Sequence, residues 1–154
     1  MLQHARFCVV PDLTHALWLH ERCRDQGLAG VSASLVMSKD RLGSDRVLIE
    51  QGTLAKLLGP LSTIMAFPVM GPLAVVGGLL EPLRAAALRA TVGGFTGALV
   101  RLGLTTPDAI RSAAGVRDGG ILLVIDFVDE TQAQLVDAVI AAFGLRPLKP
   151  EQAP

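Results

Sequence analysis

The chain has 154 residues, of which 51% are hydrophobic, 18% are charged and only 4% are aromatic. This length allows one domain with a sizeable core, which buries about two-thirds of the surface that the unfolded chain exposes. Fourteen Lys and Arg residues balance fourteen Asp and Glu residues, so the sequence lacks the excess of basic residues on which nucleic-acid binding depends. We therefore expect no nucleic-acid partner.

The N-terminal residues predict a strand followed by a helix. The opening sequence MLQHARFCVV has no basic segment followed by a long apolar one, so we expect no signal peptide and a cytoplasmic location. Cys8 and Cys23 fall on this strand and this helix. A chain that is not exported gives no reason to expect a disulfide, so both are predicted to be buried thiols.

The same strand-helix unit occurs twice in the chain. Residues 6–28 and 123–145 match at a constant offset of 117, and the shared positions are Asp12 with Asp129, Thr14 with Thr131, Ala16 with Ala133, Gly27 with Gly144, and Leu28 with Leu145. In the second copy Asp129 is expected to cap a helix over about 130–143, with Gln132 returning a hydrogen bond and Gly144 ending the helix in the left-handed conformation.

Further strands complete this pattern. Residues 31–37, VSASLVM, alternate apolar with smaller or polar side chains, as a half-buried strand does. The run ILLVI at 121–125 is apolar throughout and predicts a central strand buried on both faces. After Leu145 two prolines leave room only for a vestigial last strand.

These elements predict an α+β fold of the ferredoxin-like type. Residues 1–37 and 116–150 together would form the domain, with the first strands of the two halves side by side in the centre of an antiparallel sheet. Between the halves we expect a charged linker over 38–53 and an apolar helical insert over 54–115.

The insert contains the most unusual stretch of the sequence. Residues 57–80 form a run of 24 without a charge, a length and apolarity typical of a membrane span. Three prolines, Pro60, Pro68 and Pro72, interrupt any helix through it. The second apolar run, 90–100, is too short to span a bilayer. We therefore expect no transmembrane helix.

A second helix is predicted from Pro82 to Gly103, with small residues along one side. Ala86, Ala90, Gly94 and Ala98 recur every four residues, and Gly93 and Gly97 widen the stripe. Such a stripe lets another helix backbone approach closely, so these six residues are the candidate helix-packing and self-association site. After it, Thr106-Pro107-Asp108 predicts the start of a short helix that ends at about Ala114.

The arrangement as a whole resembles a known family. A half-repeat is split by an insert rich in Gly, Ala, Pro and Leu, and is followed by a Pro-initiated helix, LTTPDAIRSA, and by Gly-Gly before an apolar strand, GGILLVI. These features are similar to those of the bacterial general stress protein family and its uncharacterised relatives. The resemblance covers nearly the whole chain and implies a ferredoxin-like fold without an established enzymatic activity or a defined catalytic residue. The insert departs from the family in its larger side chains, which are Ile64, Met65, Phe67 and Met70.

No motif for catalysis, a cofactor or a metal stands out. Cys8, His15, His20 and Cys23 could be brought together, but they include no C-x-x-C pair of the kind structural zinc sites use. The glycine clusters lack the Lys-Ser/Thr of a phosphate-binding loop. Asp126 could be a buried acid, although such a residue more often lies at a strand end in solvent. We predict no catalytic residue, no cofactor and no metal.

Three classes of function remain open. The first is a non-enzymatic homo-oligomer that self-associates through residues 54–103, since a large exposed apolar patch is rare on a soluble monomer. The second is a protein bound to a membrane surface by a re-entrant hairpin of the insert. The third is a small-molecule sensor or an enzyme that uses the face of the sheet.

Overall fold

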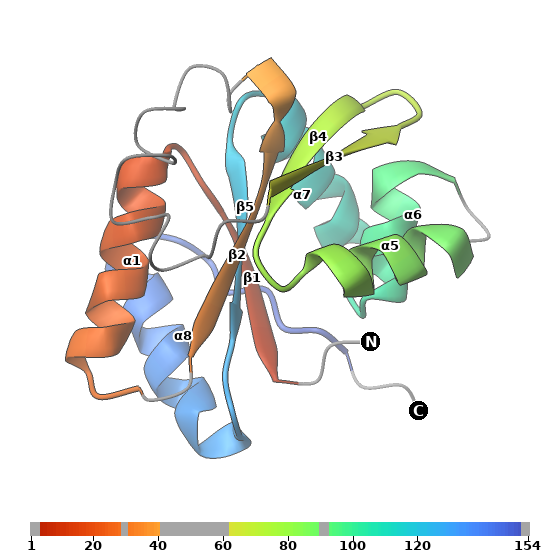
Figure 1. The fold of residues 1–154 in the computed structure, drawn as a ribbon. Helices are drawn as coiled ribbons and strands as arrows, with labels where there is room; N and C mark the ends of the chain where they lie inside the picture. Colours follow the sequence, from red (N-terminus) through yellow and green to blue (C-terminus); the bar gives the residue numbers. More distant parts are fainter. Residues whose placement is uncertain (1–3, 29–30, 41–61, 90–92, 152–154) are drawn as a thin grey trace.

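The computed structural model describes residues 4–28, 31–40, 62–89 and 93–151, and within them the chain is a mixed α/β protein built on one five-stranded antiparallel sheet. Figure 1 shows the sheet with helices on either side. The strands are β1 (Ala5–Val10), β2 (Ser32–Ser38), β3 (Ser62–Phe67), β4 (Gly71–Val76) and β5 (Ile121–Asp126). The helices are α1 (Leu13–Asp25), α5 (Leu80–Arg89), α6 (Gly94–Arg101), α7 (Thr106–Arg117), the short 3₁₀ helix η1 (Glu130–Gln132) and α8 (Ala133–Ala142).

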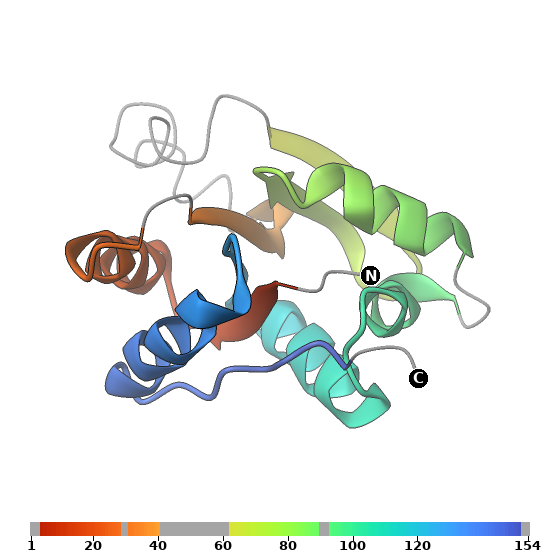
Figure 2. The same cartoon turned by 90° about the horizontal axis from the view of Figure 1, so that it is seen from below.

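The helices form two layers, one on each face of the sheet. Helices α1 and α8 cover one face, and α5, α6 and α7 cover the other, as the view in Figure 2 makes plain. Alternate residues of each strand point to opposite faces. Cys8 and Leu35 therefore join the first core, which lies under α1 and α8, and Phe7 and Val36 join the second core, which lies under α5, α6 and α7. The sheet is therefore apolar on both sides.

The strand order is β1-β5-β2-β4-β3, and each neighbouring pair is antiparallel. Strand β5 lies between β1 and β2, with Leu123 opposite Cys8 on one side and Leu35 on the other. All of its residues from Ile121 to Ile125 are buried. The prediction of a central strand at 121–125 is confirmed.

The repeated strand-helix unit is visible in the helix ends. The Asp12 carboxylate accepts a hydrogen bond from the His15 backbone N–H, and the Asp129 carboxylate accepts one from Thr131. At the other end Leu28 N–H donates to Cys23 O, and Leu145 N–H donates to Ile140 O. These two bonds are related by the same 117-residue offset.

Both terminating glycines of this unit have a left-handed backbone, with φ of 78° at Gly27 and 73° at Gly144. The predicted glycine stop is confirmed. The Gln132 side chain accepts from Val128 N–H rather than from the N–H of Asp129, so the expected return bond of the second copy is shifted by one residue.

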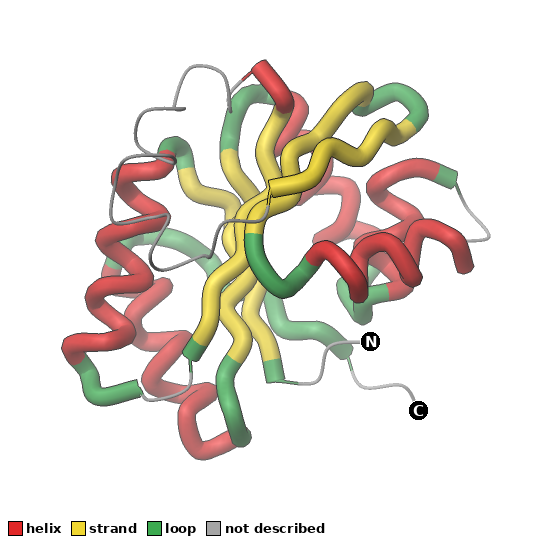
Figure 3. Tube along the Cα trace, viewed as in Figure 1, coloured by secondary structure: helices red, strands yellow, loops and turns green. Residues whose placement is uncertain are grey.

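The first described part of the insert, residues 62–76, is a β-hairpin, and the prediction of a helix there was wrong. Figure 3 shows residues 62–76 as two strands at one end of the sheet. Strand β4 pairs with β2, so the insert extends the sheet instead of forming a separate subdomain. The turn contains Val69 at φ 70°, with Met70 N–H donating to Pro68 O, a γ-turn geometry that reverses the chain tightly. Most of the predicted linker, 41–53, lies outside the described residues.

The predicted helix from Pro82 to Gly103 is two helices, and that prediction also needs correction. Helix α5 ends at Arg89, and α6 begins at Gly94, whose φ of 83° breaks the helical path. The two helices pack against each other in the second core. Helix α7 does start where expected, but Thr105 rather than Thr106 is its cap, since the Thr105 hydroxyl accepts from Asp108 N–H.

The C-terminal residues run along the outer edge of β1. Phe7 and Leu148 exchange two backbone hydrogen bonds, of 2.9 and 2.7 Å. Farther on, Glu151 N–H donates to Gly103 O over 2.7 Å. The predicted vestigial strand is thus a single bridge, which covers the β1 edge of the sheet.

Candidate functional site

The six small residues predicted as one packing stripe are not on one helix. Ala86 lies on α5, Gly97 and Ala98 lie on α6, and Gly93 and Gly94 form the start of α6. Ala90 lies outside the described residues. Buried Ala86 and Ala98 belong to the same core beneath α5 and α6, so close helix packing occurs within one chain. Their part in self-association stays a prediction.

Much of the apolar insert is also buried within the chain. Phe67, Leu73, Val75 and Leu79 are 6% exposed or less and join the core under α5, α6 and α7. The Phe67 and Phe95 rings meet edge to face, with centroids 5.4 Å apart, an arrangement that aromatic pairs favour. These contacts fix the hairpin to α6.

Other apolar side chains of the insert face solvent. Ile64 on β3 is 44% exposed, Val69 in the turn is 91% exposed and Leu88 on α5 is 83% exposed. Burying such side chains on association would be favourable, by about 1.5–3 kcal/mol for a fully buried Val, Leu or Ile. The insert therefore keeps an apolar surface after the fold is complete.

The two edges of the sheet differ in their cover. The β1 edge carries the bridge to Leu148, whereas no backbone hydrogen bond from any described residue reaches the outer edge of β3. Edge strands that must not pair usually carry charges, prolines or bulges. Strand β3, STIMAF, has no charge and no proline, and its register with β4 runs without a bulge.

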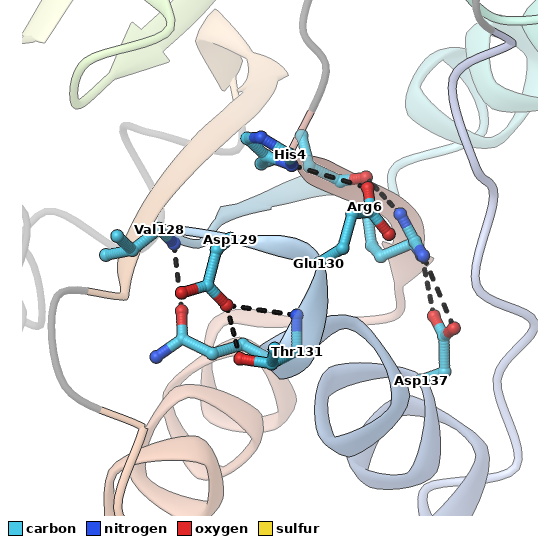
Figure 4. Close-up of polar contacts among 9 residues, drawn as sticks. His4, Arg6, Val128, Asp129, Glu130, Thr131 and Asp137 are labelled. Atoms are coloured by element: carbon cyan, nitrogen blue, oxygen red, sulfur yellow. Dashed lines mark hydrogen bonds and ion pairs between the residues drawn. The ribbon is translucent and has the colours of Figure 1, made fainter.

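A polar cluster that the sequence did not predict lies at the opposite edge, where β1 begins and α8 packs. Figure 4 shows the Arg6 side chain directed at Asp137. Arg6 Nε donates to Asp137 Oδ1 over 2.7 Å, and Nη1 donates to the Ala5 carbonyl over 2.9 Å. The Arg6 side chain is only 4% exposed, against 39% for Asp137. The guanidinium also lies 5.3 Å from the centre of the Phe127 ring, a cation–π distance.

Neighbouring residues of this cluster are more exposed. His4 Nδ1 lies 3.3 Å from Glu130 Oε1, and both side chains are open to solvent. The Thr131 hydroxyl donates to the Asp129 carboxylate, and this bond, with the backbone hydrogen bonds from Thr131 and Gln132, lowers the pKa of the Asp129 carboxyl. The Asp129 bonds start the second repeated helix. The cluster is therefore explained by its structural role, which is to hold β1, the end of β5 and α8 together.

Asp126 ends β5 on the face that α5, α6 and α7 cover, between Ala5 and Ser32 in the sheet. Burial raises the pKa of its carboxyl from 3.8 to about 6. In the described part of the chain, no hydrogen bond or ion pair reaches this carboxylate. The possibility of a buried acid, raised from the sequence, thus has a physical basis.

The two cysteines and His20 are buried, and burial disfavours their charged forms. Burial raises the pKa of the Cys8 thiol to about 12 and that of Cys23 to about 11, which suppresses the reactive thiolate. Both are free and buried, as predicted. His20 is buried, and burial followed by the charge of Arg24 lowers its pKa. Among residues with described positions, no three His, Cys, Asp or Glu side chains come together as a metal site would need.

In the described ranges no helix has the length and apolarity to cross a membrane. Comparisons with protein-family models, with curated proteins and with solved structures found no match.

Proposed function

We propose that this chain is a non-enzymatic protein that works as a homo-oligomer, and that two copies join through antiparallel pairing of their β3 strands. One observation carries the proposal: the molecule covers one edge of its sheet with its own C-terminal residues, while the β3 edge has neither a described partner nor a residue that would oppose pairing. An edge of this kind presents unpaired backbone donors and acceptors to another strand.

The chemistry of β3 suits a second copy as the partner. Because the strand is uncharged, two copies brought together about a two-fold axis meet without like-charge repulsion. The sheet is antiparallel throughout, so such pairing continues it into the second molecule. Each copy would use the outer edge of β3, which no described strand occupies, and the dimer would be closed. Ile64, which is 44% exposed, would gain cover from the partner.

The proposal also includes a ferredoxin-like fold and a likeness to the general stress protein family. The order β1-β5-β2, with both repeated helices on one face and a last bridge at the outer edge of β1, supports a ferredoxin-like core. We assign the chain to the general stress protein type on the sequence resemblance alone, and a role in stress physiology follows from that resemblance.

Light scattering on purified full-length protein at micromolar concentration tests the proposal. The wild-type chain should have the mass of a dimer or a multiple of it. Ile64→Lys should be monomeric, because a charge on an edge strand opposes pairing. The matched control is Ile110→Lys on α7, where the native side chain is 54% exposed, and this variant should keep the wild-type mass.

A wild-type monomer would refute the proposal, and so would equal dissociation by the two lysine variants. Flotation of the protein with anionic lipid vesicles tests the membrane-surface alternative. Vesicle binding by a monomeric wild-type chain that is lost in Ile64→Lys would favour that alternative. Circular dichroism of each variant establishes that it is folded.

A further inference from the structure

We infer that a groove between the C-terminal tail and the start of α7 binds a small molecule bearing two anionic groups, phosphate or carboxylate. The groove has a volume of about 830 Å³, within the range of small-molecule sites. Three basic side chains line it, Arg111 from α7 and Arg146 and Lys149 from the tail. It lies apart from the β3 edge and does not depend on oligomerisation.

The basic groups of the groove are available to a ligand. Arg146 and Lys149 are exposed, and neither forms an ion pair or hydrogen bond with any described residue. Arg111 is 64% exposed and makes one long contact, 3.8 Å, with Asp108. The chain as a whole is neutral, so three cations facing one groove are a local concentration of positive charge.

Two acidic residues also line the groove and reduce this charge. Asp108 is only 14% exposed, and its charge is partly offset by Arg111. Glu151 is exposed at the far end of the tail. The solvent-facing groups therefore retain an excess of cations, which attracts an anion. The Asp108 N–H at the start of α7 is not part of the site, because the Thr105 hydroxyl already accepts its hydrogen bond.

The tail holds the groove in a defined shape. Leu148 is fixed by two hydrogen bonds to Phe7, and Glu151 is fixed by its bond to Gly103. Three prolines, Pro107, Pro147 and Pro150, form its walls, and Pro150 is buried. Proline restricts the backbone, so Arg146 and Lys149 extend from a pre-organised segment, which lowers the entropy cost of binding. Arginine suits both ligand chemistries because its guanidinium can bind either oxyanion with two hydrogen bonds.

Titrations of the full-length protein with inorganic pyrophosphate and, separately, with succinate test the site at constant ionic strength. The expected result is saturable binding of at least one of the two, with amide NMR shifts confined to 103–111 and 145–151. The double variant Arg146→Gln/Lys149→Gln should weaken that binding at least tenfold. Arg117→Gln, which removes an exposed cation at the other end of α7, should leave it unchanged.

The preferred ligand in this experiment distinguishes phosphate from carboxylate chemistry. Absence of saturable binding by both anions would overturn the inference. Equal weakening by Arg117→Gln and by the double variant would also overturn it, because it would show general charge attraction instead of a site. The variants change exposed side chains only, and an unchanged melting temperature verifies that the fold persists.

Discussion

At the scale of single residues, the buried Arg6 guanidinium makes the fold sensitive to the loss of its partner. Its partner, Asp137, comes from α8, while Arg6 belongs to β1. Removing one partner from such a pair leaves a charge without compensation in a poorly solvated place. Because Asp137 is 39% exposed, water offsets part of this penalty, and we expect Asp137→Ala to cost about 2–3 kcal/mol.

Urea unfolding of a double-mutant cycle measures this coupling. Arg6→Met should cost a similar amount, but the double variant Arg6→Met/Asp137→Ala should cost less than the sum by at least about 1 kcal/mol. Additive costs would mean that the contact contributes no coupling and that Arg6 matters only through its packing on Phe127.

Asp126 should make stability depend on pH. Since burial raises its folded-state pKa from 3.8 to about 6, the folded protein holds this proton more tightly than the unfolded chain does. The contribution of Asp126 to the free energy of unfolding is therefore greatest below about pH 4. It falls as the pH rises to about 6 and is constant above that.

Asp126→Asn should remove this dependence. We expect the variant to be more stable than the wild type at pH 7, by about 1–2 kcal/mol after allowance for solvent screening, with no such gain at pH 4. Urea titrations at the two pH values measure the difference. The same substitution at exposed Asp25 is the control, and an equal gain there, or a gain at pH 4, would contradict the assignment.

Local signals explain which of these residues the sequence could identify. The caps at Asp12 and Asp129 and the stops at Gly27 and Gly144 depend on a few adjacent residues, so they could be predicted. The pair of Arg6 and Asp137 could not be, because its partners are 131 positions apart and meet only after the two repeated units have packed. No feature of the sequence around Arg6 indicates that its side chain is buried.

At the scale of elements, Gly94 decides how the insert turns. The small-residue stripe predicts that a bulky residue here would overpack a helix contact. The structure gives another reason for a cost, because Gly94 has φ of 83° and a Cβ added to it would meet only the Pro68 carbonyl, at an ordinary 3.7 Å. The left-handed conformation itself costs a residue with a Cβ about 1–2 kcal/mol.

Gly94→Ala should therefore lower the free energy of unfolding by about 1–2 kcal/mol. The adjacent Gly93 is the N-cap of α6, with an ordinary φ of −67° and open space around it. Alanine is a poorer N-cap than glycine, but it also lowers the entropy of the unfolded chain, so Gly93→Ala should change stability by only a few tenths of a kcal/mol. Thermal or urea unfolding of the two variants compares them directly. Equal costs at the two positions would show that the backbone of Gly94 is not the reason.

The apolar run at 57–80 shows why element type was harder to predict than element boundaries. A continuous apolar run has no clear period, so it fits a buried strand as well as a buried helix. Proline interrupts a helix, but here Pro68 follows β3 and Pro72 lies within β4. The sequence predicts one helix from Pro82 to Gly103 because Gly93 and Gly94 fit a packing stripe, whereas in the structure they form the start of α6.

At the scale of the whole molecule, the C-terminal residues cover the β1 edge of the sheet, whereas no described residue pairs with the outer edge of β3. The sequence predicts an apolar insert in need of cover, and the fold supplies much of it through β4, α5 and α6. What remains outside is a strand edge with Ile64 beside it. Packing of the insert on its own chain could not be predicted, because it depends on the pairing of β4 with β2, two strands that are far apart in the sequence.

Hydrogen exchange measured at several protein concentrations tests pairing through the β3 edge most directly. We predict that amides within residues 62–67 become more protected as concentration rises through the range in which the mass doubles, while amides of β1 and β5 keep the same protection. Protection of β3 that does not change with concentration, in a sample whose mass shows association, would contradict pairing at this edge.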